Sequence, residues 1–496
     1  MSKIEMKNLT FGFDTMASLL FDQANLVIDT QWKLGLIGRN GRGKTTLLQL
    51  MLGKYSYSGT ISHQLKFTYF PQEISDKTQL TYDCLQEVSA FALWEMEREL
   101  NLLQADPEIL WRPFASLSGG EQTKALLALL FVDDQYFPLI DEPTNHLDIT
   151  ARQQVADYLK AKRSGFIVVS HDRSFVNEIV DHILSIEKSQ LVLYQGNFAT
   201  YEEQKEKRDR YEQEQNQKLK KEIGRLQQSA VEKAEWSRSR EKDKKGKPTQ
   251  KGSGAIYDTG AIGARAARTM KRSKAIVNRM EEKADEKKSL LYDIEDIESL
   301  TMNYQPSYHK QLLKVEALQL SYTEQPLFPP ISFEIKQGQR LAIQGPNGSG
   351  KSSIIQFLLG EFNGKVSGNA TFAHDLSISY VRQNYEDNTG TLQEFAQAHH
   401  LSYEELLTNL HKLGVERKVF ANRIEQMSLG QRKRVELAKS LATPAELFIW
   451  DEPLNYLDVF NHEQLEAVIQ SVQPTMLVVE HEATFLQNIA TKIVYL

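Results

Sequence analysis

The sequence has little cysteine and no long apolar run. Its one cysteine, Cys84, excludes a disulfide within the chain and any metal or iron–sulfur site built from several cysteines. No run approaches the roughly 18–20 apolar residues that a membrane-spanning helix needs. The N-terminal segment MSKIEMKNL also lacks the long apolar core of a signal peptide. These absences predict a cytoplasmic protein that inserts no helix into a membrane.

A phosphate-binding motif occurs twice. The chain has 496 residues, enough for three or four domain-sized units. LGLIGRNGRGKTT ends at Thr46 and LAIQGPNGSGKSS ends at Ser353, and both match G-x-x-x-x-G-K-[ST] after a short apolar strand and before a helical pattern. Glycines let backbone N–H groups converge on phosphates, while Lys44 and Lys351 add positive charge. Two such matches predict two nucleotide-binding domains.

Further polar residues follow each loop in the same order and at equal spacing. Each half has an apolar strand that ends in Asp-Glu, a serine in a glycine-containing turn 23 residues before that Asp, and a histidine 30 residues after it. A lone Asp-Glu pair or strand-end histidine is usually structural, but five matched elements in both halves are not explained that way. The matched residues are Gln72, Ser118, Asp141, Glu142 and His171 in the first half, and Gln383, Ser428, Asp451, Glu452 and His481 in the second.

The middle of the chain, 201–304, differs from both halves. It is rich in Glu, Lys, Arg and Gln, with a narrow apolar seam at Leu219, Ile223, Leu226, Ala230 and Ala234 and a second seam at Ile276, Met280, Ala284, Leu291 and Ile294. Such seams are typical of helices that each pack on one partner helix. Pro248 and five glycines between the seams forbid one continuous helix. We therefore expect an antiparallel helical hairpin with arms of roughly 50–60 Å.

Positive charge is concentrated between the two seams. Residues 233–279 contain 14 Lys/Arg and 4 Asp/Glu, a net charge of +10, whereas the whole chain carries −6. A solvated helix face mixes both signs, so a basic tip on an acidic protein indicates contact with a phosphate backbone. Trp236 and Tyr257 could stack on bases, although packing within the tip is the simpler explanation for lone aromatic residues.

Both halves resemble the ATP-binding-cassette (ABC) ATPases. The resemblance rests on the two loops quoted above, on LSGGEQ around Ser118 and MSLGQR around Ser428, and on the DEP segments that begin at Asp141 and Asp451. The resemblance implies α/β domains that pair head to tail around two ATP molecules and Mg²⁺. It implies catalytic roles for Glu142, Glu452, His171 and His481, and Mg²⁺ contacts for Thr45, Gln72, Asp141, Ser352, Gln383 and Asp451. Phe11 competes with Phe13 for the adenine contact. The implied nucleotide contacts are Phe13, Gly38, Asn40, Gly41, Gly43, Lys44, Thr45, Thr46, Gln72, Ser118, Gly119, Gly120, Glu121, Asp141, Tyr322, Gly345, Asn347, Gly348, Gly350, Lys351, Ser352, Ser353, Gln383, Ser428, Gly430, Gln431 and Asp451.

Within that family the chain resembles the ABC-F proteins, and among them the Lsa-type antibiotic-resistance proteins of Gram-positive bacteria. WRPFASLSGGE, KGSGAIYDTGAIGARAARTMKRSK and WDEPLNYLDVF carry this similarity. It implies ATPase domains at 1–200 and 305–496, joined by a helical hairpin at 201–304 whose basic tip is near 241–264. It also implies a monomer that enters the tRNA exit site of the 70S ribosome beside 23S rRNA and P-site tRNA. There it would protect the peptidyl-transferase centre against lincosamides, pleuromutilins and streptogramin A.

The two halves differ at several motif positions. The second signature reads MSLGQ, so Leu429 replaces a glycine, and Leu454 and Tyr456 stand where the first half has Thr144 and His146. These differences predict unequal rates of ATP hydrolysis at the two sites. Two other functions also remain open: a housekeeping translation factor of the same architecture, and the ATPase subunit of a membrane transporter. The basic tip predicts an anionic partner, which argues against the transporter function.

Overall fold

In a computed structural model, the chain is described at residues 3–13, 19–133, 135–145, 147–243 and 299–496, and at Lys271, Ala275, Ile276 and Arg279. It divides into one unit formed by 1–201 and 297–496, and a second unit formed by 202–296. His146, residues 244–264 of the predicted tip and most of the second seam lie outside the described residues.

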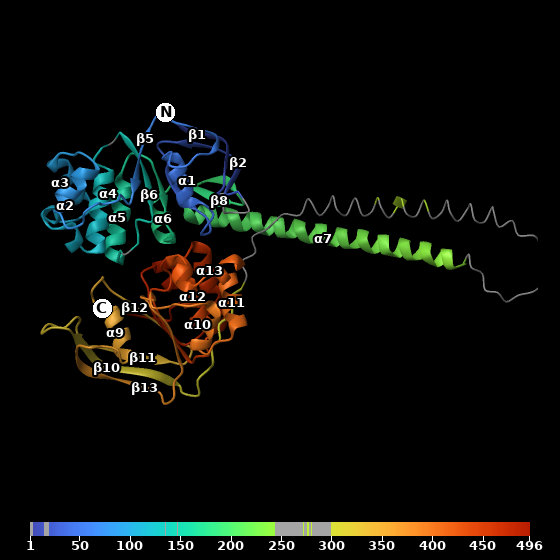
Figure 1. The fold of residues 1–496 in the computed structure, drawn as a ribbon. Helices are drawn as coiled ribbons and strands as arrows, with labels where there is room; N and C mark the ends of the chain where they lie inside the picture. Colours follow the sequence, from blue (N-terminus) through green and yellow to red (C-terminus); the bar gives the residue numbers. More distant parts are fainter. Residues whose placement is uncertain are drawn as a thin grey trace, which may run out of the picture. The chain divides into compact units, whose positions relative to one another are not determined.

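The first ATPase domain has a small antiparallel sheet and a larger, mostly parallel one (Figure 1). The small sheet has the order β2-β1-β4, and the large one has the order β5-β6-β7-β3-β8-β9, in which only β9 runs antiparallel to its neighbour. The strands are β1 (Lys3–Phe11), β2 (Phe21–Asp29), β3 (Lys33–Ile37), β4 (Ser58–Ser62), β5 (Lys66–Phe70), β6 (Tyr136–Asp141), β7 (Phe166–Val169), β8 (His182–Glu187) and β9 (Gln190–Gln195). The helices are α1 (Lys44–Met51), α2 (Thr81–Val88), α3 (Leu93–Leu102), η1 (Pro107–Trp111), η2 (Phe114–Ser116), α4 (Gly119–Leu130), α5 (Ile149–Ala161) and α6 (Arg173–Ile179).

The second ATPase domain repeats this plan. Its antiparallel sheet has the order β11-β10-β13, and its parallel sheet has the order β14-β15-β16-β12-β17. The strands are β10 (Gln311–Ser321), β11 (Ile331–Lys336), β12 (Arg340–Gln344), β13 (Lys365–Phe372), β14 (Ile378–Val381), β15 (Leu447–Asp451), β16 (Met476–Val479) and β17 (Lys492–Tyr495). The helices are α9 (Lys351–Leu358), α10 (Leu392–Ala398), α11 (Tyr403–Lys412), η3 (Arg417–Ala421), η4 (Ile424–Gln426), α12 (Leu429–Ala442), α13 (Val459–Val472) and α14 (Ala483–Ile489). The predicted fold of two tandem α/β ATPase domains is confirmed.

The central strands of each large sheet are buried on both faces. Phe166, Ile167, Val168 and Val169 of β7 are each at most 1% exposed. Such continuous apolar strands are expected when helices cover both sides of a parallel sheet. Strands β6 and β15 end in Asp141 and Asp451 at the carboxyl edge, where α/β sheets place their ligands.

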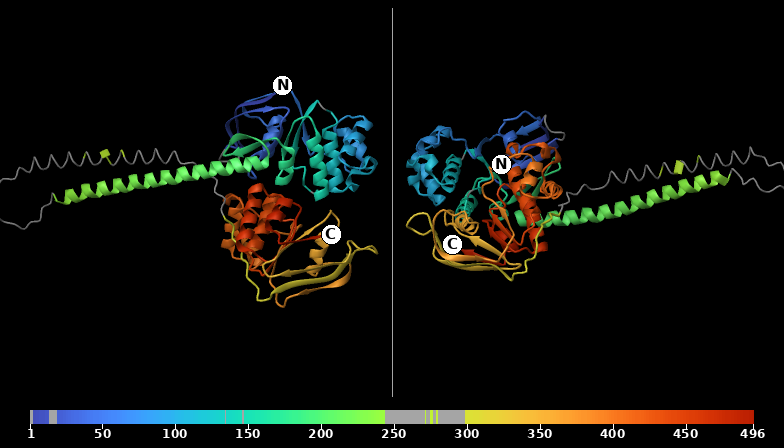
Figure 2. Two further views of the ribbon diagram at one scale, coloured as in Figure 1. Left: turned by 180° about the vertical axis from the view of Figure 1, so that it is seen from behind. Right: turned by 60° about the horizontal axis from the view of Figure 1, so that its bottom comes forward.

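The second unit is described mainly by one helix, α7 (Phe198–Asp243), which is unbroken in every view (Figures 1 and 2). Its 46 residues correspond to roughly 69 Å at 1.5 Å per residue, so the helix is longer than the predicted arm. Ile223 is buried and Leu219 and Leu226 are partly buried among exposed neighbours, as the seam predicted. The hairpin itself stays a prediction.

Candidate functional site

Each phosphate-binding loop leads into a helix that begins at its lysine. Gly43 and Gly350 precede α1 and α9 with φ of +96° and +93°. A side chain there would be strained, and its Cβ would lie 3.2 Å from Phe21 and 2.9 Å from Phe328 respectively. The glycines therefore aim the N–H groups of both helix N-termini at one point, which is an anion-binding arrangement.

The lysines lie over their own loops. Lys44 Nζ donates to the carbonyl oxygen of Gly38 at 2.8 Å, and Lys351 Nζ donates to the carbonyl oxygen of Gly345 at 2.9 Å. Burial lowers the pKa of both lysines, and nearby carboxylates oppose this effect. Each ammonium group is therefore fixed beside the helix N-terminus, where a phosphate group would need a positive charge.

An aspartate from the adjacent strand approaches each loop. Thr45 Oγ1 donates to Asp141 Oδ2 at 2.7 Å, and Ser352 is likewise hydrogen-bonded to Asp451. Burial raises the pKa of both aspartates, that of Asp451 to about 6. A buried carboxylate beside a hydroxyl group is a suitable oxygen ligand set for Mg²⁺.

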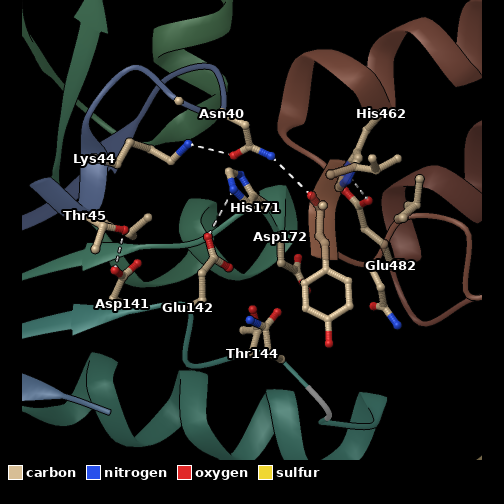
Figure 3. A pocket seen from close by; sticks show the side chains of 18 of the residues that line it. Asn40, Lys44, Thr45, Asp141, Glu142, Thr144, His171, Asp172, His462 and Glu482 are labelled. Carbon is tan, nitrogen blue, oxygen red and sulfur yellow. Dashed lines mark hydrogen bonds and ion pairs between the residues drawn. The ribbon is translucent and has the colours of Figure 1, made fainter. Parts of the chain in front are cut away.

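The glutamates that follow these aspartates have an uncommon backbone conformation. Glu142 and Glu452 have φ of 52° and 46°, and their N–H groups donate to Val169 and Val479. Left-handed non-glycine residues are costly and cluster at functional sites. The turn projects both carboxylates beyond the sheet edge, where Glu142 Oε1 lies 3.3 Å from His171 Nε2 (Figure 3).

The two glutamates are in different electrostatic environments. Burial and the neighbouring Asp141 raise the pKa of Glu142 to about 8. Burial opposes ionisation of Glu452 too, but His481, Gln383 and Asn455 outweigh it and hold the pKa of Glu452 at about 2. Burial, with the charge of Lys44, lowers the pKa of His171 well below its usual range, which keeps this imidazole neutral.

Two cavities contain most of the predicted residues. The first cavity, around Lys44, has a volume of about 460 Å³, and the second cavity, around Lys351, about 410 Å³. Phe13, not the core residue Phe11, reaches the first cavity. Predicted residues that line the first cavity are Phe13, Asn40, Gly41, Gly43, Lys44, Thr45, Thr46, Asp141, Glu142, His171 and, from the second domain, Gly430. Those that line the second cavity are Tyr322, Asn347, Gly348, Gly350, Lys351, Ser352, Ser353, Gln383, Glu452 and His481.

Other predicted residues lie behind or beside these linings. The described linings omit Gly38, Gln72, Ser118, Gly119, Gly120, Glu121, Gly345, Ser428, Gln431 and Asp451.

The signature serines act as helix caps. Ser118 Oγ accepts the Glu121 N–H at 3.2 Å, and Ser428 Oγ accepts the Gln431 N–H at 3.3 Å. Glu121 is further held by Arg112 at 3.0 Å. These polar groups order the N-termini of α4 and α12.

Two aspartates that sequence reasoning missed join the domains. Asp458 Oδ2 accepts the Asn40 N–H at 2.7 Å, and Asp148 Oδ2 accepts the Asn347 N–H at 3.0 Å. Each aspartate also caps its own helix, α13 or α5. The repeated NHLD and NYLD segments were a signal for them, because both end at these residues. Each loop is therefore contacted by the opposite domain, as head-to-tail pairing requires.

The donor set fits ATP with Mg²⁺. Asp451 Oδ1 is buried and has no hydrogen-bond partner among the described residues. Buried carboxylate oxygens need a partner, and a hard cation or a water molecule bound to it satisfies them. The lysines and helix N-termini supply the complementary charge for phosphates. In this arrangement Thr45, Asp141, Ser352 and Asp451 would hold the metal.

Comparison with known proteins decides the family. A family model described as ABC transporter matches residues 21–145 and 328–455, just over half of the chain. The chain belongs to the ABC family. No helix among the described residues of this ABC ATPase is long and apolar enough to cross a membrane.

Individual relatives narrow this assignment. The ABC ATPase is 28% identical to the ribosome protection protein VmlR of Bacillus subtilis, over 96% of this chain and 84% of VmlR. It is also 28% identical to the ATP-binding protein Uup of Haemophilus influenzae, over 98% of this chain and 78% of Uup. These full-length similarities place it in the ABC-F group. An archaeal ribosome recycling factor, aABCE1, shares its fold, with a TM-score of 0.64 over 98% of this chain and 87% of that chain at 19% identity.

Proposed function

We propose that this ABC-F ATPase binds the 70S ribosome in its ATP-bound form and protects the peptidyl-transferase centre from antibiotics. Similarity to the ribosome protection protein VmlR along nearly the whole chain is the observation that carries the proposal. The net charge of +10 in residues 233–279 supports an RNA partner, because neutralised phosphates dominate such binding. The expected drugs are lincosamides, pleuromutilins and streptogramin A, and the expected location is the cytoplasm.

The site residues would act as follows. When bound, ATP supplies the phosphoryl group and Mg²⁺ neutralises its charge. Lys44 and Lys351 hold the phosphate end at the helix N-termini, while Phe13 and Tyr322 flank the adenine. Glu142 and Glu452 orient and polarise the attacking water as general bases.

Closure and release follow from contacts made by both domains. Asp148 and Asp458 link each loop to the opposite domain. A ligand that contacts both domains favours the paired arrangement, and its hydrolysis removes that preference. We propose that the protein acts as a monomer whose segment 201–304 enters the tRNA exit site near 23S rRNA and P-site tRNA.

Co-sedimentation tests the ribosomal partner. The double variant Glu142→Gln with Glu452→Gln should bind ATP without hydrolysing it and should pellet with 70S ribosomes in ATP. Rising salt should release it steeply, because phosphate contacts are screened. The matched control adds Lys44→Ala and Lys351→Ala to the same protein. Absence of ATP-dependent association at low salt would contradict the proposal and favour a membrane partner.

A housekeeping translation factor of the same architecture is the second candidate, because the identity to the ribosome protection protein VmlR is no higher than the identity to the ATP-binding protein Uup. Drug susceptibility separates the two. Expression of the wild-type chain should raise the inhibitory concentration of lincosamides, whereas shortening of 244–264 should abolish protection and leave ribosome binding intact. Ribosome binding without any change in drug susceptibility would support the housekeeping role.

A further inference from the structure

A buried ionic chain joins the two domains on one side of their interface. Arg173, the first residue of α6, donates from Nε to Glu482 Oε1 at 3.1 Å and also pairs with Glu466 of α13. Arg173 is 7% exposed and Glu482 is 3% exposed. Charges this deeply buried are stable only when each is paired. The position of Glu482 is therefore set by a residue of the other domain.

Glu482 in turn holds a histidine that faces the first cavity. Its Oε2 lies 3.0 Å from His462 Nδ1, and both residues line the first cavity (Figure 3). His462 is 3% exposed, and neither ring nitrogen makes a hydrogen bond of standard geometry among the described residues, so Nδ1 meets Glu482 as an ion-pair contact. Burial opposes charging of the ring, but Glu482 outweighs it and raises the pKa of His462. Glu482 thus stabilises the protonated ring.

The helix that carries His462 is fixed against the first phosphate-binding loop. His462 lies in the first turn of α13, and the cap of that turn, Asp458, accepts the Asn40 N–H at 2.7 Å. The charged or titratable groups that face the histidine from the packed elements are Glu142 and His171 beyond β6 and β7, Arg173 on α6, Glu480 after β16, and Glu482. His462 thus reaches, from the second domain, the cavity that Glu142 lines.

The second cavity has a matching arrangement with different residues. Arg152 occupies the position in α5 that His462 occupies in α13, and its Nη1 lies 3.0 Å from Asp172 Oδ2. Arg152 lines both cavities, whereas His462 lines the first. The positions that correspond to Arg173 and Glu466 are Ala483 and Ala156. Alanine cannot form an ion pair, so these positions provide no equivalent of the cross-domain ion pairs beside Arg152. Histidine is a weaker base than arginine, and it is His462, not Arg152, whose carboxylate partner is held by an arginine of the other domain.

We propose that His462 is a positioning residue for ATP hydrolysis at the first cavity. Its ring, fixed through Glu482 by Arg173, provides positive charge to the cavity that the Glu142 carboxylate also lines. The inference rests on the proposed role of Glu142. The placement of the histidine does not depend on that role and can be tested without nucleotide.

Histidine NMR of the full-length protein tests the placement. The protein is labelled with ¹³C at histidine Cε1, and the His462 signal is the one missing from His462→Arg. We expect this signal to titrate above the ordinary histidine pKa of about 6.5, and Glu482→Gln to lower its pKa by about one unit or more. An unchanged pKa in Glu482→Gln, or titration below the ordinary value, would overturn the ion pair.

Steady-state hydrolysis tests the function. In a Glu452→Gln background, His462→Gln should lower kcat about tenfold with KM changed less than twofold, and His462→Arg should recover most of the loss. The factor by which His462→Gln lowers kcat should be at least three times larger in the Glu452→Gln background than in the Glu142→Gln background. Equal losses, or no rescue by arginine, would overturn the proposal. If the Glu452→Gln protein itself were inactive, the proposal that both cavities hydrolyse ATP would be contradicted. The NMR titration would then still test the ion pair between His462 and Glu482.

Discussion

The first and second cavities share their motifs but hold their glutamates differently. Glu452 Oε2 accepts Gln383 Nε2 at 3.0 Å and Asn455 Nδ2 at 2.7 Å. In the first domain the corresponding Gln72 donates instead to the carbonyl oxygen of Leu126 at 3.3 Å. The motif therefore provides the carboxylate, and the neighbouring side chains, His481 together with the two amides, decide whether it is oriented and ionised.

The difference lies in side chains and not in the backbone. Glu142 and Glu452 share the same left-handed turn, and each N–H bonds the strand that precedes the histidine. Identical scaffolds with different side-chain partners are expected to differ in rate, because catalytic groups must be held within a fraction of an ångström. We infer that the second cavity hydrolyses ATP faster.

The largest effect should come from removing both carboxylates. Glu142→Gln with Glu452→Gln should lower phosphate release by about 10²–10⁴-fold, the usual contribution of a general base. ATP binding, measured by equilibrium filtration, should persist because neither glutamate holds the phosphates. Residual hydrolysis above a tenth of the wild-type rate would show that another group activates the water.

A smaller effect should follow from releasing Glu452 alone. Asn455→Ala removes the 2.7 Å hydrogen bond to this carboxylate and should lower steady-state hydrolysis by roughly tenfold. The matched control is Asn145→Ala, because the described side-chain hydrogen bonds include none between Asn145 and Glu142. That variant should change the rate by less than about twofold. Equal losses in the two variants would remove the physical basis of the asymmetry.

The smallest effect concerns the second signature turn. Leu429→Gly should raise hydrolysis about twofold in a Glu452→Gln background, because the backbone beside Gly430 could approach the first cavity more closely. Glycine at the start of α12 should also cost roughly 0.5–1 kcal/mol of stability, measurable by urea unfolding. A lower rate at unchanged stability would show that Leu429 itself contributes contacts.

Much of the fold was predictable because its signals are local. The strand that ends in Asp141, the helix that starts at Lys44 and the equal spacings in both halves all follow from short sequence patterns. The same patterns placed Lys351 and His171 among the candidates, and the family resemblance added Phe13. The structure brings all three to the cavity linings. The described part of α7 likewise follows its apolar seam.

The contacts across the interface could not be predicted, because they join residues far apart in the chain. Asn40 and Asp458 are 418 positions apart, and Arg173 and Glu482 are 309 apart. The choice between Gln383 facing Glu452 and Gln72 facing Leu126 is a matter of side-chain orientation, for which the shared Gln motif carries no signal. Asp148 and Asp458 were hidden by their ordinary role as helix caps.

Single-turnover hydrolysis by the two single variants tests the inequality of the sites most directly. Glu142→Gln and Glu452→Gln are mixed with a trace of labelled ATP, and phosphate release is followed against the wild type. Because Glu452 is the oriented carboxylate, the factor by which the rate falls should be about five times larger for Glu452→Gln than for Glu142→Gln. Loss of the same fraction in both variants would contradict the account.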